Sequence, residues 1–167
     1  MMSSMFQIRY MHRAMPLLLV VLMLAGCADD PEASNEYRAH LSGPRGAAHI
    51  IVYRLETPPH ALPVTFSIDG QSARMLDSHF TCFDVPPGTH QLVAKWRADA
   101  VLPETSLMVS AHAGETKCVQ LRSELGPIEM VYPVVIGAPG ESWLTELPLE
   151  QAEPDLGMTA FVPPTRQ

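Results

Sequence analysis

The sequence has few basic residues and no basic cluster. Its 167 residues include 11 lysines and arginines against 18 aspartates and glutamates, and its two lysines are Lys95 and Lys117. Proteins that contact phosphate backbones present a basic patch or stripe on one face. The acidic balance therefore excludes nucleic acid as a partner. It also leaves the chain without an electrostatic attraction to anionic lipid.

Long hydrophobic runs are absent as well. The apolar run Met15–Leu24 is about ten residues long, whereas a membrane-spanning helix needs roughly 20. Arginines precede this run and small residues end it, which is the layout of a secretory signal peptide. We therefore predict a signal peptide over residues 1–26. Two alternatives to a lipoprotein signal remain. One is a conventional secretory signal followed by an accidental cysteine, and the other is a short uncleaved anchor.

The end of the run, Leu24-Ala25-Gly26-Cys27, resembles the lipobox of bacterial lipoproteins. The resemblance implies that the thiol of Cys27 receives a diacylglyceryl group and that cleavage leaves Cys27 as the new N-terminus. The acyl chains on Cys27 would then hold the protein on a membrane of the bacterial cell envelope. In such lipoproteins an aspartate in the next position commonly causes retention at the inner membrane. Because Ala28 stands there, we expect the outer membrane, with the domain facing the periplasm.

Motifs for catalysis and for metal binding are missing from the rest of the chain. There is no Gly-x-Ser-x-Gly nucleophile turn and no Cys-x-x-Cys redox motif. The histidines after residue 26 lack partners at the spacings typical of metal ligands, which favours scattered surface histidines, although three strands could still bring them together. We expect no catalytic residue, no metal and no cofactor. These histidines are His40, His49, His60, His79, His90 and His112.

Two cysteines, Cys82 and Cys118, remain once Cys27 is assigned to the lipid. An even number of cysteines outside the cytoplasm suggests a disulfide. The alternation around them can place Phe83 and Val119 toward the core, so that both cysteines lie on the opposite face and meet if their strands are neighbours. We predict a Cys82–Cys118 disulfide, with two separate buried thiols as the alternative.

Short strands separated by turn signals indicate one all-β domain. The chain contains 16 prolines, most of them between these strands. We predict a single small β-sandwich, immunoglobulin- or transthyretin-like, with seven or eight strands in residues 46–149. Residues 27–45 are expected to form the lipidated N-terminus and a flexible tether, and residues 150–167 a disordered tail. The expected strands lie at 48–55, 64–68, 72–76, 80–85, 89–98, 106–111, 116–121 and 128–136; residues 141–149 are either a last strand or a short helical turn.

Two turn motifs carry a family resemblance. Ile68-Asp69-Gly70 and Pro87-Gly88-Thr89-His90, with the strands around them, are similar to an uncharacterised domain family of bacterial lipoproteins and to PEGA-type surface modules. The resemblance covers roughly Ala47 to Ser123, and it implies a small β-sandwich with no established activity. The segment from Ile128 to Leu149 departs from this pattern, so additional strands or a lid are expected there.

The aromatic residues give the candidate binding positions. Trp96 shares its strand register with Leu92, so we expect it in the core. Trp143 and Tyr132 are the candidates for contact with a ligand or partner, because rings exposed on one face can stack on a sugar.

We therefore expect a lipid-anchored cell-envelope protein with a non-catalytic structural or protein-interaction role, whose partner is another envelope protein. The alternative is a periplasmic module that binds a glycan or small ligand, which requires Trp143 and Tyr132 to be accessible and adjacent.

Overall fold

The computed structural model describes residues 36–41, 44, 46–100, 102–131, 134–137 and 140–166. These residues belong to one compact unit, Glu32–Gln167. The expected signal peptide, its lipidated Cys27 and the candidate aromatic Tyr132 lie outside the described residues. In the described part of the chain, no helix has the length and apolar character needed to cross a membrane.

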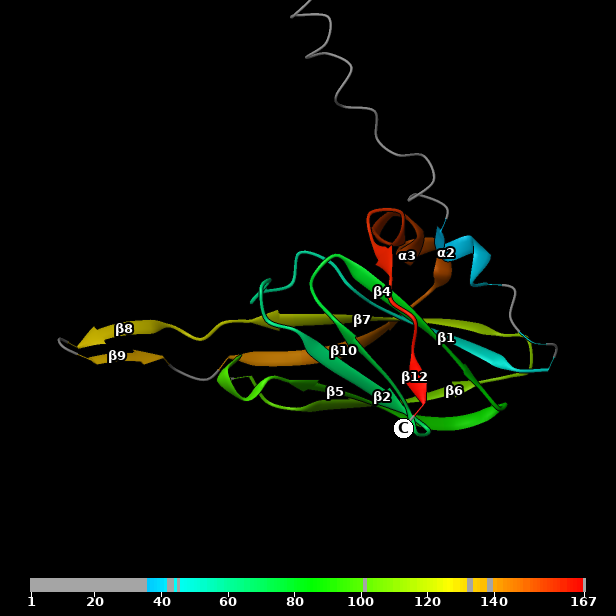
Figure 1. Cartoon of the computed structure of the whole chain (residues 1–167), viewed down its shortest axis with the longest axis horizontal. Coiled ribbons are helices and arrows are strands. Elements are labelled where there is room, and N and C mark those ends of the chain that lie inside the picture. Colours follow the sequence, from blue (N-terminus) through cyan, green and yellow to red (C-terminus); the bar gives the residue numbers. More distant parts are fainter. Residues whose placement is uncertain are drawn as a thin grey trace, which may run out of the picture. The chain divides into compact units, whose positions relative to one another are not determined.

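The described residues form two five-stranded sheets and a separate two-stranded one (Figure 1). Sheet A has the order β10 (Glu141–Leu147), β7 (Thr116–Glu124), β1 (Ala48–Arg54), β4 (His79–Val85) and β11 (Ala160–Phe161). Sheet B has the order β12 (Thr165–Arg166), β3 (Gln71–Met75), β2 (Val64–Ile68), β5 (Gly88–Trp96) and β6 (Thr105–Ala111). The third sheet pairs β8 (Ile128–Val131) with β9 (Val134–Gly137). The prediction of an all-β sandwich is confirmed.

The main core lies between the two sheets. Strand β2 alternates buried and half-buried residues, which is the pattern of a strand with one face in the core and one toward water. The turn after it, Asp69-Gly70, has positive φ at both residues (47° and 74°), as a two-residue hairpin turn requires. The buried members of this core include Ile50, Val52, Val64, Phe66, Met75, Phe83, Leu92, Trp96, Val109, Val119 and Leu121.

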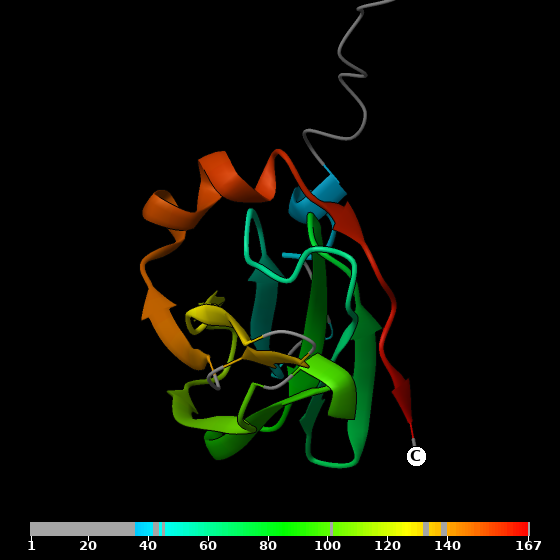
Figure 2. The ribbon, with the colours of Figure 1, turned by 90° about the vertical axis from the view of Figure 1, so that its left-hand side faces the viewer.

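The outer face of sheet A is covered too, which explains why every residue of β1 is buried. The covering elements are α2 (Glu36–Ala39), α3 (Leu149–Leu156) and the segment around β11 (Figure 2). They form a second, smaller core with the outward residues of sheet A. Its buried members are Tyr37, Ile51, Tyr53, Phe80, Cys82, Cys118, Ala152 and Leu156.

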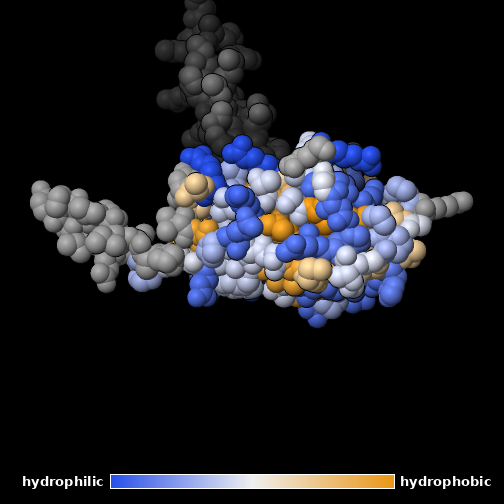
Figure 3. Space-filling model, turned by 90° about the horizontal axis from the view of Figure 1, so that it is seen from below, coloured by the Kyte–Doolittle hydropathy of each residue, from blue (hydrophilic) through white to orange (hydrophobic). Residues whose placement is uncertain are grey.

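Among the described residues, no helix covers the outer face of sheet B. Strand β6 exposes alternate residues, and Met108 on it is 60% exposed. Figure 3 shows this face of the molecule: polar residues occupy most of it, and hydrophobic residues form scattered groups. The two sheets therefore differ in what their outer faces contact, since sheet A packs against helices and sheet B faces solvent.

Two predicted boundaries are wrong. The predicted tether includes α2, where Tyr37 is buried in the second core. The predicted disordered tail contains α3, β11 and β12, and Leu156 of α3 is fully buried. The described helices α2 and α3 bury apolar side chains against sheet A, a contact that local composition does not reveal.

The predicted Cys82–Cys118 disulfide is corrected by the structure, in which both thiols are free and buried. The prediction of their common face is right: Cys82 and Cys118 both lie in the second core. However, each pairs with Ile51, from opposite sides, because β1 lies between β4 and β7. Two strand spacings separate the cysteine backbones by roughly 10 Å, beyond the limit of about 7 Å for a disulfide.

Candidate functional site

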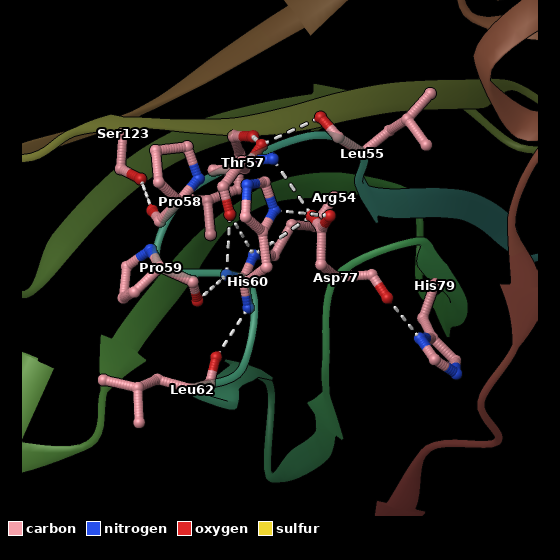
Figure 4. Close-up of polar contacts among 11 residues, drawn as sticks. Arg54, Leu55, Thr57, Pro58, Pro59, His60, Leu62, Asp77, His79 and Ser123 are labelled. Carbon is pink, nitrogen blue, oxygen red and sulfur yellow. Dashed lines mark hydrogen bonds and ion pairs between the residues drawn. The ribbon is translucent and has the colours of Figure 1, made fainter.

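A buried arginine organises the loop that follows β1. Arg54 is fully buried, and its guanidinium donates hydrogen bonds to the carbonyl oxygens of Thr57 (2.7 and 3.2 Å), Pro59 and Leu62 (2.7 Å) (Figure 4). The guanidinium carbon also lies 4.7 Å from the centre of the Trp96 ring. Three carbonyl groups of the loop thus converge on one cation in the interior, which sets the path of the loop.

Asp77 completes this cluster from the other side. Its carboxylate lies 3.6 Å from Nε of Arg54 and accepts a 3.0 Å hydrogen bond from the backbone N–H of Thr57. Its second oxygen lies 2.8 Å from Nδ1 of His60 (Figure 4). Burial lowers the pKa of Arg54, while the charge of Asp77 acts in the opposite direction. Arginine is not deprotonated in proteins, so the guanidinium of Arg54 keeps its positive charge.

The same loop is attached to β7. The hydroxyl of Thr57 lies 3.0 Å from the carbonyl oxygen of Leu121, and the hydroxyl of Ser123 donates to the carbonyl oxygen of Pro58. Glu56, which directly precedes these anchors, adopts a left-handed conformation with φ 50°, which is uncommon for a residue other than glycine. The loop therefore holds Glu56 in a strained conformation at an exposed position.

This loop forms one wall of a pocket with a volume of about 340 Å³. Strand β7 contributes further lining residues, Trp143 comes from β10, and Asp155 comes from α3. The described part of the lining contains three carboxylates and one guanidinium, so the charge of these residues is negative in sum. The lining residues are Leu55, Glu56, Thr57, Gln120, Arg122, Ser123, Glu124, Trp143 and Asp155.

A chain of hydrogen bonds joins three of the polar side chains that line the pocket. The buried Tyr53 hydroxyl donates to Oδ2 of Asp155 (3.2 Å), and the side-chain amide of Gln120 donates to the same oxygen (3.3 Å). Nε of Arg122 donates to the carbonyl oxygen of the Gln120 side chain (2.9 Å). Burial, followed by the nearby charge of Asp155, raises the pKa of Tyr53, so its hydroxyl stays protonated and remains a donor.

The two tryptophans lie in different surroundings: one lines the pocket and the other is in the main core. Trp143 is half-buried and lines the pocket together with Glu124 and Asp155. Trp96 lies in the main core, as expected. The adjacency of Trp143 and Tyr132 stays a prediction, because Tyr132 lies outside the described residues.

Several residues that line the pocket were not among the candidates predicted from the sequence. Gln120 and Arg122 share the outward register of β7 with Cys118, so the alternation that located the cysteine also marked them. No strand alternation marks Asp155. It lies in the segment that was predicted to be a disordered tail. Among the described residues that line the pocket, none is a histidine.

Comparison of the sequence with protein-family models and with curated proteins gives no match.

Proposed function

We propose that this protein is a lipid-anchored binding protein of the bacterial cell envelope, and that its pocket takes a small polar ligand such as a sugar. The anchor is the acylated Cys27 implied by the lipobox resemblance. The role is binding rather than catalysis. This proposal combines the location expected from the sequence, the cell envelope, with the alternative function of binding a glycan or small ligand.

The arrangement of the pocket carries this proposal. A half-buried indole provides an apolar wall, and hydrogen-bonding groups from β7 and α3 stand around the same space. Ligand sites typically combine an apolar surface with a few fixed polar groups, and they begin at about 300 Å³. Asp155, Glu56 and Glu124 outnumber Arg122, which disfavours anions. A neutral or cationic polyhydroxylated ring fits this chemistry, with hydroxyls toward the carboxylates and its C–H face on Trp143.

The test is ligand binding by a Trp143→Ala variant. Soluble peptidoglycan fragments and simple amino sugars should change the tryptophan fluorescence of the wild-type protein, and calorimetry gives the dissociation constant. Loss of the aromatic wall should weaken binding roughly tenfold, the effect of an aromatic contact. Trp143→Phe, which keeps an aromatic face, should retain most of the affinity. Equal affinity in wild type, Trp143→Ala and Asp155→Asn would place the ligand elsewhere and contradict the proposal.

The anchor is tested independently of the pocket. Cys27→Ser should abolish incorporation of labelled palmitate and move the protein from the membrane fraction to the soluble fraction, because no basic surface replaces the acyl chains. Cys118→Ser is the matched control, and this variant should remain fully membrane-bound. Unchanged processing and membrane partitioning in Cys27→Ser would show that Leu24-Ala25-Gly26-Cys27 is not a lipobox.

A second candidate function, binding to another envelope protein, is favoured by the β8–β9 hairpin. Among the described strands, β8 and β9 pair only with each other. Their sequences, Ile-Glu-Met-Val and Val-Val-Ile-Gly, contain one charged residue, Glu129. An isolated two-stranded hairpin is marginally stable in water, and a partner strand added to its edge would stabilise it. This role does not require Trp143, so the Trp143→Ala variant separates the two functions.

A further inference from the structure

Three potential metal ligands come together on the outer face of sheet A. His49 on β1 lies directly opposite Asp84 on β4, and Cys82 lies two residues before Asp84 on the same face. One ligand atom from each of the three side chains lies within 4.8 Å of those of the other two. The cluster is separate from the Trp143 pocket, whose lining contains none of these residues.

The burial of the cluster is graded. His49 is 4% exposed and Cys82 is 8% exposed, whereas the side chain of Asp84 is 46% exposed. Nδ1 of His49 lies 2.7 Å from Oδ1 of Asp84. The thiol of Cys82 lies 3.6 Å from the carbonyl oxygen of His40, in the turn that follows α2. The nitrogen and sulfur ligands are thus held by the core, and the oxygen ligand faces water, which gives an ion a route of entry.

We propose that His49, Cys82 and Asp84 bind a Zn²⁺ ion, with water in the remaining coordination position. Imidazole, thiolate and carboxylate are the three ligand types that zinc takes from proteins. A thiolate in the set disfavours Mg²⁺ and Ca²⁺, which prefer oxygen ligands. Zinc–ligand bonds of about 2.0–2.3 Å place tetrahedral ligand atoms roughly 3.3–3.6 Å apart, so small side-chain rotations are enough to close the site.

Binding exchanges one proton for the metal, and neutral His49 binds through a ring nitrogen that carries no proton. The Cys82 thiol gives its proton to solvent water as the sulfur–zinc bond forms, and the His49–Asp84 hydrogen bond opens as both groups turn to the ion. Burial and the nearby charge of Asp84 raise the pKa of Cys82 to about 12, so without metal the thiol stays protonated and inert. Zn²⁺ supplies the positive charge that this buried position otherwise lacks.

The test is metal titration of the full-length lipoprotein in detergent after treatment with a chelator. Co²⁺, which takes the same tetrahedral sites, should bind one ion per chain and show a thiolate-to-cobalt charge-transfer absorption, and one equivalent of Zn²⁺ should remove that absorption. Cys82→Ser should abolish the charge-transfer absorption. It should also weaken zinc binding at least roughly 100-fold, since even the loss of a supporting residue costs 10- to 100-fold.

Matched variants distinguish the site from a folding defect. Asp84→Asn changes an exposed side chain, so the protein should stay folded and bind Zn²⁺ more weakly by at least roughly tenfold. His90→Gln removes another histidine–aspartate pair, His90–Asp69, and should leave binding unchanged. Cys118→Ser removes the other buried thiol and should also leave it unchanged. Cobalt binding without a thiolate signal, or equal binding by wild type and Asp84→Asn, would overturn the proposal.

Discussion

Replacement of Arg54 by alanine is expected to lower the free energy of unfolding by about 3–5 kcal/mol. The substitution removes the donor that serves the carbonyl groups of Thr57, Pro59 and Leu62, and it leaves Asp77 without its cation. Buried polar groups without partners cost far more than the net value of the bonds they lose. A loss of this size is a large part of the stability of a typical domain.

Urea unfolding, followed by circular dichroism, measures this loss directly. Arg74→Ala is the matched control, because Arg74 is an exposed arginine on β3, and a change within about 0.5 kcal/mol is expected there. Because Arg54 also fixes the loop that carries Glu56 and Thr57, the Arg54→Ala variant should bind ligand less well even where it remains folded. A loss below about 1 kcal/mol would show that the buried arginine does not organise the loop.

The positions of most strands could be predicted from local chemistry. Strict alternation over Val64–Ile68, and Asp69-Gly70 after it, specify a strand and a hairpin turn by themselves. The same applies to Gly114, whose positive φ of 75° lies in the turn expected between β6 and β7. In each case the residues that determine the strand or the turn lie within a few positions of one another, so a short stretch of sequence is enough to predict it.

The cysteine pair shows where local reasoning fails. Alternation assigns a residue to a face, and this assignment was right for Cys82 and Cys118. It does not determine which strands are neighbours, because strand order depends on how distant segments pair. Strand β1 lies between β4 and β7, so the two cysteines are on either side of Ile51. They are therefore free thiols and not the expected disulfide.

The candidate site was only partly visible for the same reason. Trp143 is a candidate on the basis of the residues next to it in the sequence. Gln120 and Asp155 line the same pocket but come from β7 and α3, which are distant in the sequence. The His49 and Cys82 side chains likewise approach each other only because β1 pairs with β4. Sites assembled from several elements are determined by the topology, which no short motif in this chain encodes.

Helix α3 was missed because its stability comes from tertiary contacts. It has eight residues and contains Pro154, which cannot donate a helical hydrogen bond. A helix of this length is not stable on its own in water. Its buried residues, Ala152 and Leu156, follow the i, i+4 spacing of one helix face, and they pack on the outer face of sheet A. The segment is thus a structural part of the domain and not a tail.

A Leu156→Ala variant tests this role, and it should lower the free energy of unfolding by about 2–5 kcal/mol. Leu156 is fully buried in the second core, so truncation removes apolar contact and leaves a cavity beneath α3. Gln151→Ala, an exposed position on the same helix, is the control and should stay within about 0.5 kcal/mol of wild type.

The Leu156→Ala variant also connects the helix to the pocket. Asp155, the next residue, accepts the hydrogen bonds of Tyr53 and Gln120, so loosening α3 should release Asp155 from the lining of the pocket. Hydrogen exchange should then show faster exchange of the amides of α3 in the variant, with the strands of sheet B unchanged. If Leu156→Ala is as stable as Gln151→Ala and its α3 amides already exchange freely in wild type, the segment does not pack on sheet A. Asp155 would then not belong to the pocket.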